Sequence, residues 1–129
     1  MGVVSQPLLE ARARVLHDLA ARGLDTAAAV SVVDEVVSAR RWWLEQWAEG
    51  APYLACLVAQ DVQEALLEHI GRWPACTVSH EADAPHHIEV PNDPMPHELH
   101  VAPDLGEDPH WVCERSGVVV APVGALTPN

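Results

Sequence analysis

Apolar residues recur every three or four positions through the first 73 residues, which is the period of an amphipathic α-helix. Short connections between such helices favour antiparallel packing, so the pattern predicts a three-helix antiparallel bundle. Each helix has a glycine at or just after its end, as helices commonly do. The three helices are expected over residues 6–22, from Asp25 or Thr26 for roughly 24 residues, and from Pro52 to Gly71.

The helical spacing of apolar residues ends near Trp73, and prolines and histidines become frequent after it. Nine of the eleven prolines and six of the eight histidines lie in residues 74–129, so long helices cannot persist there. The sequence therefore predicts an α+β protein, with a helical bundle over residues 1–73 and a small antiparallel β tail over residues 74–129 packed on it. Strands are expected at 87–90, 97–101, 111–114 and 118–123, with Ser116-Gly117 as the turn between the last two.

Two cysteines bracket this tail, and a sheet so small usually needs a cross-link. His80 follows Cys76 by four positions, and His110 precedes Cys113 by three. Thiolate sulfur and imidazole nitrogen are the ligands of structural zinc sites, which bind the ion tetrahedrally. We therefore predict one structural Zn²⁺ held by Cys76, His80, His110 and Cys113.

Other arrangements of the tail are compatible with the same residues. A disulfide between Cys76 and Cys113 would also cross-link the tail, although such bonds are rare in a reducing compartment. The histidines could instead be ordinary surface residues that bind no metal. Cys56, inside the third helix, is expected to be a buried core thiol. Alternative metal ligands to His80 and His110 are His86, His87, His97 and His100.

The tail contains the motifs Trp73-Pro74-Ala75-Cys76, His80, Trp111-Val112-Cys113, Gly117 and Val120-Ala121-Pro122-Val123-Gly124-Ala125-Leu126. In these motifs it resembles the C-terminal part of small actinobacterial proteins of uncharacterised function, which have a helical first part and a degenerate zinc-ribbon-like end. The resemblance implies a zinc-ribbon-like tail and no particular activity. In this chain Cys76 and His80 are farther apart than in that pattern, and residues 81–86 are inserted.

Charge and hydropathy exclude several classes of partner. The formal net charge is −12, and all seven basic residues are arginine, so the chain should repel nucleic-acid phosphates. No apolar run approaches the roughly 20 residues that span a bilayer, and the first residues do not have the order of a secretory signal. We expect a cytoplasmic protein that binds neither nucleic acid nor membrane.

Trp42 is the least expected residue of the helical part. Its neighbours at helical spacing are Ser38, Glu45 and Gln46, so it points away from the apolar stripe of its helix. One interpretation is that the β tail folds over it. The other is that Trp42 lies at an interface with another protein chain, because exposed large aromatic residues mark such interfaces. A homodimer is one form that this contact could take.

Known catalytic motifs are missing from the sequence. It contains no phosphate-binding loop, no nucleophile elbow and no Cys-x-x-Cys pair. His97-Glu98-Leu99-His100 has a spacing of three, which in a strand sends the two histidines to opposite faces. We therefore expect a non-enzymatic, zinc-stabilised component of a protein–protein interaction or assembly. The alternative is a small zinc-dependent hydrolase with an open metal position in the His-rich tail.

Overall fold

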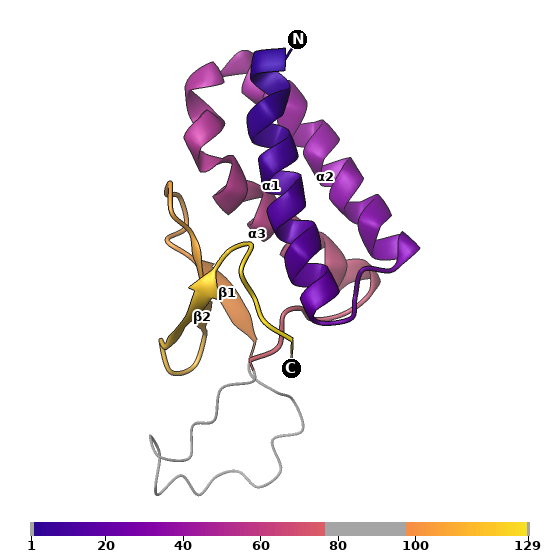
Figure 1. Cartoon of the computed structure of the whole chain (residues 1–129), viewed down its shortest axis with the longest axis vertical. Coiled ribbons are helices and arrows are strands. Elements are labelled where there is room, and N and C mark those ends of the chain that lie inside the picture. Colours follow the sequence, from indigo (N-terminus) through magenta and orange to yellow (C-terminus); the bar gives the residue numbers. More distant parts are fainter. Residues whose placement is uncertain (1, 77–97, 129) are drawn as a thin grey trace, which may run out of the picture.

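The computed structural model describes residues 2–76 and 98–128, which form an α+β fold of three α-helices and one three-stranded sheet (Figure 1). Each helix contacts the other two, and β1 contacts α3. None of the described helices is both long and apolar enough to cross a membrane. The elements are α1 (Gly2–Ala21), α2 (Ala27–Gln46), the 3-10 helix η1 (Ala48–Tyr53), α3 (Leu54–His69), β1 (Leu99–Ala102), β2 (His110–Cys113) and β3 (Val119–Pro122).

The start of α2 agrees with its sequence signal, because the Thr26 hydroxyl accepts a hydrogen bond from the Ala29 N–H at 3.2 Å. Its end differs from the prediction. The helix stops at Gln46, and the chain turns through η1 before α3 begins at Leu54. The physical reason is aromatic packing around Gly50.

At this turn the rings of Trp43 and Trp47 meet edge to face, with their centroids 5.3 Å apart. Both rings lie against Gly50, where an added Cβ atom would overlap the Trp43 ring. The close approach of backbone and rings requires a residue without a side chain. Pro52 consequently lies inside η1 and not in the first turn of the third α-helix.

The sheet is antiparallel in the order β1-β2-β3, with Leu99 opposite Cys113 and Val101 opposite Trp111. Leu99 and Val101 are buried while His100 is exposed, which is the alternation expected of a sheet with one covered face. Three of the predicted strands are present, with ends shifted by one or two residues. The strand predicted at 87–90 lies outside the described residues.

A buried carboxylate ties the sheet and the C-terminal segment to α1. Asp18 is fully buried, and its Oδ2 atom accepts hydrogen bonds from the Trp111 indole N–H at 2.8 Å and the Gly124 N–H at 2.6 Å. Its Oδ1 atom accepts one from the Leu126 N–H at 3.0 Å, and His17 Nδ1 lies 3.0 Å from the same atom. Figure 1 shows the C-terminal segment running back toward α1. These donors offset the cost of burying the charge.

Candidate functional site

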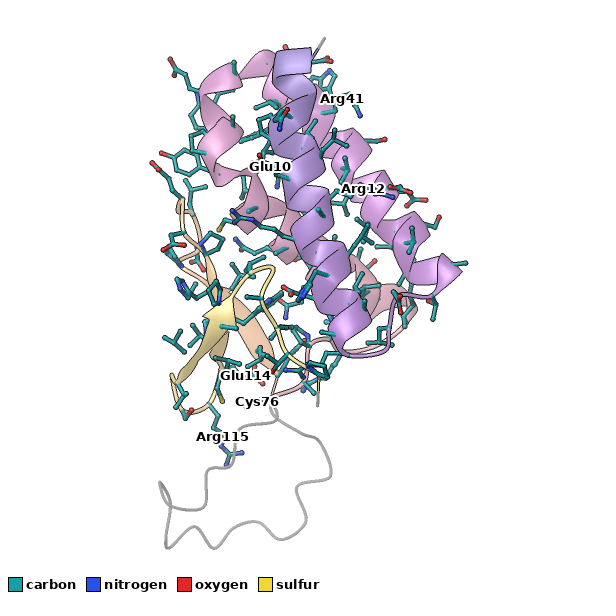
Figure 2. All side chains as sticks on the ribbon, in the orientation of Figure 1. Glu10, Arg12, Arg41, Cys76, Glu114 and Arg115 are labelled. Carbon is teal, nitrogen blue, oxygen red and sulfur yellow. The ribbon has the colours of Figure 1, made fainter. Side chains whose placement is uncertain are left out.

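The fold brings Cys76 and Cys113 together at one end of the sheet. Ala75 pairs with Glu98 in an isolated bridge, so the segment that ends at Cys76 lies beside the start of β1. Cys113 is the last residue of β2, on the other side of β1. The side chain of Cys76 hydrogen-bonds to that of Cys113, and both residues are thiols. Cys76 and Glu114 lie at the same end of the sheet in Figure 2.

The Cys113 sulfur lies in a cradle of hydrogen-bond donors made by the turn that follows it. The Ser116 N–H lies 3.4 Å from the sulfur, and the Ser116 hydroxyl and the Arg115 N–H also donate to it. Gly117 has φ +79° and donates its N–H to the Cys113 carbonyl at 2.9 Å, which closes the turn. Burial of Cys113 disfavours the thiolate, but these donors and Cys76 outweigh it and lower the pKa of Cys113 to about 6.

This environment suits a metal-bound sulfur. Thiolate is the form of cysteine that binds metal ions, and N–H donors around a ligating sulfur hold it in place and stabilise its charge. Two thiols make half of a tetrahedral zinc site. No group of three or more His, Cys, Asp or Glu side chains in residues 2–76 and 98–128 is arranged to hold a metal ion.

His110 does not lie beside Cys113, although both belong to β2. Trp111 and Cys113 are buried, whereas His110 and Val112 are half-buried on the other face of the strand. His110 Nδ1 lies 3.0 Å from the Asp108 carbonyl oxygen. The predicted pairing of His110 with Cys113 as zinc ligands therefore has no geometric support. Residues three positions apart in a strand point to opposite faces, so the sequence already contained this signal.

The other predicted ligands divide into two groups. His100 is exposed on β1, on the opposite face from the buried Leu99 and Val101. His80, His86, His87 and His97 lie outside the described residues.

Two acidic residues, Glu98 and Glu114, pair across the strands at this end of the sheet. The Glu98 N–H donates to Glu114 Oε2 at 3.1 Å, and the Glu114 N–H donates to the Glu98 carbonyl at 3.1 Å. Burial raises the pKa of Glu98, as does the nearby charge of Glu114, while Arg72 and the Trp73 N–H act in the opposite direction. Glu98 and Glu114 neighbour Leu99 and Cys113 in the chain, so strand alternation points their side chains to the face opposite the Cys113 sulfur.

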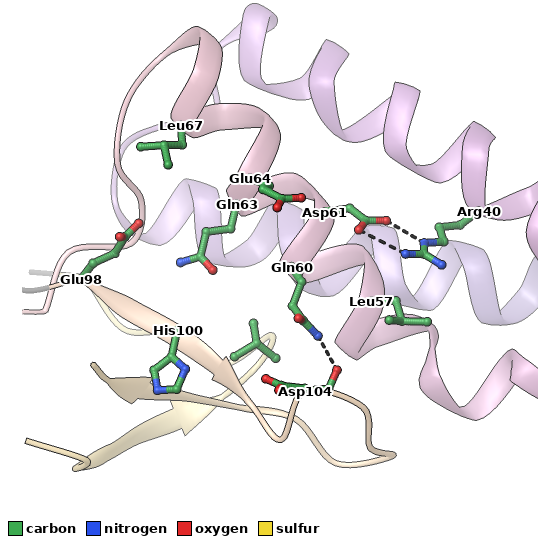
Figure 3. A pocket seen from close by; sticks show the side chains of 11 residues that line it. Arg40, Leu57, Gln60, Asp61, Gln63, Glu64, Leu67, Glu98, His100 and Asp104 are labelled. Carbon is green, nitrogen blue, oxygen red and sulfur yellow. Dashed lines mark hydrogen bonds and ion pairs between the residues drawn. The ribbon is translucent and has the colours of Figure 1, made fainter. Parts of the chain in front are cut away.

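A separate hollow of about 420 Å³ lies between α3 and the β1 region (Figure 3). Gln60 crosses part of it and donates to the Asp104 carbonyl at 2.6 Å, and the Arg40 guanidinium binds both carboxylate oxygens of Asp61 at 2.6 and 3.2 Å. Glu64 and Glu98 add two more carboxylates to its lining. Sequence reasoning did not identify this hollow, because its walls come from distant segments.

Trp42 is 65% exposed on α2. Trp43 and Trp47 pack against each other, and Trp47 stacks on Tyr53 with centroids 6.2 Å apart, but Trp42 takes no part in this cluster. The expectation that the tail covers Trp42 does not hold for the described part of the tail.

The fold and the thiol pair define a small α+β protein whose helices and cysteine-bearing β tail share one core. The chain belongs to a family described as a domain of unknown function (DUF8819), whose model matches residues 4–123. The matched region includes all three strands, Cys76 and Cys113, and the helices except for the first two residues of α1. No curated protein and no solved structure matches the chain.

Proposed function

We propose that this protein is a non-enzymatic component of a protein–protein interaction or assembly, with a β tail cross-linked by one structural Zn²⁺ that Cys76 and Cys113 bind. The observation that carries the proposal is the contact between these two cysteines together with the donor cradle around the Cys113 sulfur.

A tetrahedral zinc site needs two further ligands. The sequence predicts His80 and His110, with His86, His87, His97 and His100 as alternatives. His110 and His100 lie on the faces of their strands opposite the buried residues, which leaves His80, His86, His87 and His97 as candidates. All four lie between Cys76 and β1 in the chain, so a site that uses two of them would fix that connection to the end of the sheet. Zinc binding then contributes directly to folding stability.

The interaction role is supported by the surface of the helices. Trp42 exposes a large aromatic side chain away from the aromatic cluster of α2 and η1, and large aromatics are enriched where protein interfaces have their strongest contacts. The net charge of −12 favours a protein partner over nucleic acid. The proposed partner is therefore a protein.

Metal analysis tests the zinc site. Protein prepared without a metal-binding tag is expected to contain one zinc ion per chain by mass spectrometry. Cys76→Ser and Cys113→Ser are each expected to lose the zinc and to lower the melting temperature. Cys56→Ser is the matched control, because the Cys56 thiol donates to the Pro103 and Asp104 carbonyls at 3.2 Å, and a hydroxyl can do the same. Wild-type protein that folds normally without zinc would contradict the proposal.

The number of protein ligands separates an assembly component from a zinc hydrolase. We expect Co²⁺-substituted protein to give the absorption spectrum of a closed tetrahedral site with two thiolates, unchanged by added small anions. A spectrum that shows a bound water replaced by anions would identify an open metal position and favour the hydrolase.

A further inference from the structure

A groove of about 350 Å³ runs between α2 and α3, away from the thiol pair. Small apolar side chains form part of its lining, namely Val36, Ala39 and Ala65, so a partner can approach the backbone of both helices closely. The remaining lining residues all carry carboxylates: Glu35 from α2, and Asp61, Glu64 and Glu68 from α3.

Most of the negative charge in this groove is not compensated within the protein. Arg40 neutralises Asp61 through two hydrogen bonds of 2.6 and 3.2 Å. No arginine or histidine in residues 2–76 and 98–128 lies within salt-bridge distance of Glu35, Glu64 or Glu68. Three like charges beside a concave, partly apolar surface create a field that attracts cations of a partner.

The negative surface continues over the outer face of α3. Asp61 and Glu64 line the groove on one side of this helix and the hollow against β1 on the other (Figure 3). Glu98 and Asp104 line the far wall of that hollow. Leu67 is 53% exposed on the same face of α3, so apolar area lies among the acids.

Trp42 extends the groove along α2. Glu35, Ala39 and Trp42 follow at four- and three-residue spacing, which places them on one face of the helix. The exposed Trp42 ring therefore lies about one turn beyond the α2 wall of the groove. Its face offers a binding surface for a guanidinium or ammonium group, since such cations are attracted to the ring of tryptophan.

We propose that the α2–α3 groove and Trp42 form the docking surface for a basic segment of a partner protein, one that presents arginines to the carboxylates and apolar side chains to the groove floor. Arginine suits the site because its planar guanidinium can bind a carboxylate through two hydrogen bonds and can also stack on an indole. The inference deepens the proposed interaction role by naming the partner's chemistry.

Charge complementarity selects this occupant over a second copy of the chain. A second copy carries the same net charge of −12 and only seven arginines, of which Arg12 and Arg40 already pair with acids of their own chain. Two such surfaces would repel each other. A basic segment instead gains attraction from the whole surface field as well as from the groove.

The test uses the whole 129-residue chain, purified with whatever metal it binds, and a labelled amphipathic peptide of arginine and leucine. A peptide of glutamate and leucine is its counterpart. We expect the basic peptide to bind with an affinity that falls as salt rises, and the acidic peptide not to bind. In two-dimensional NMR spectra the largest shifts should fall on α2 and α3 around Ala39, Trp42 and Ala65.

Two triple variants with the same change in net charge give the decisive comparison. Glu35→Gln/Glu64→Gln/Glu68→Gln is expected to weaken binding about tenfold, and Trp42→Ala several-fold. Glu10→Gln/Glu107→Gln/Asp108→Asn removes three charges elsewhere and should change affinity less than twofold. Equal losses in the two triples, shifts centred on another face, or no binding of the basic peptide would overturn the inference.

Failure here is distinguishable from failure of the zinc proposal. Metal content is measured on the same wild-type preparation before the peptide is added. A chain that contains zinc but does not bind the peptide in the groove would refute only the docking surface. A chain that binds the peptide but contains no zinc would refute only the metal site.

Discussion

Asp18 shows how one residue can join parts of the chain that are far apart in sequence. It lies on α1, yet its hydrogen-bond donors come from β2 and from the C-terminal segment. Asp18 follows Ala11 by seven residues and Val15 by three, so helical periodicity places it on the buried side of α1, but that spacing does not identify its partners. Its role became visible only when the donors around it were known, because burial of a carboxylate is tolerated only where such donors surround it.

Asp18→Asn is expected to lower the free energy of unfolding by about 2–4 kcal/mol. The amide has one acceptor oxygen in place of two, so donors such as the Trp111 indole N–H would face an amide NH₂. Chemical denaturation measures the change. Asp34→Asn, which removes an exposed ion pair with Arg12, should cost less than about 1 kcal/mol. Similar losses in the two variants would show that the Asp18 contacts contribute little.

Cys113 provides a second prediction at this scale. Its pKa of about 6 lies below the ordinary thiol value of 9.0, so the thiolate is the form that the fold stabilises. In metal-free protein this stabilisation is complete above the pKa of the unfolded chain and is lost as the pH falls toward 6. The thiolate absorbance of Cys56→Ser protein should therefore titrate near pH 6, and unfolding should require less denaturant at pH 6 than at pH 9.

Cys113→Ser is the control for this titration. The variant should lose the absorbance change near pH 6 and flatten the dependence of stability on pH between 6 and 9. Because Cys76 interacts directly with Cys113, the measured midpoint belongs to the pair and not to one sulfur alone. A midpoint near the ordinary thiol value would contradict the donor cradle.

At the scale of elements, sequence periodicity located all three helices and the three described strands of the sheet, but it misplaced several ends. Helix α2 ends earlier than predicted, and η1 takes the place of the first turn of the third helix. Ends depend on side-chain packing between successive elements, here Trp43 and Trp47 around Gly50. Apolar spacing within one segment does not contain that information.

Gly50→Ala tests this explanation of the turn. The added methyl group must displace the rings of Trp43 and Trp47, which should cost about 1–3 kcal/mol of stability. Tryptophan fluorescence during denaturation reports both the stability and the altered aromatic cluster. Gln46→Ala, at an exposed position near the end of α2, is expected to change stability by less than about 0.5 kcal/mol. If Gly50→Ala left stability unchanged, the rings of Trp43 and Trp47 could not lie against Gly50 as described.

For the whole molecule, residue composition changes near Trp73, but the two parts of the chain do not form two separate hydrophobic cores. Trp73 and Trp111 pack edge to face with centroids 5.2 Å apart, and both are buried. Leu99 and Leu126 from the second part belong to the same buried cluster as Leu19 from the first. Helices and tail therefore depend on each other for burial of their apolar surface.

A fragment of residues 1–73 is expected to keep much of its helical circular dichroism but to unfold at a lower temperature and less cooperatively than the full chain. It loses Trp111 as a partner of Trp73 and the tail's donors to Asp18. A bundle of that size is also only marginally stable alone. A fragment with the melting temperature of the full chain would show that the helices form an independent domain.

The sequence by itself determined the fold class, the approximate positions of the helices and strands, and the cysteines worth testing, since all of these depend on residue type and local spacing. Even the placement of His110 and Cys113 on opposite faces follows from strand alternation alone. Only the tertiary structure decided that Cys76 meets Cys113, that Asp18 binds the tail, and that two helices enclose an acidic groove. Each of these joins residues separated along the chain, and such contacts arise from packing, which local sequence patterns do not encode.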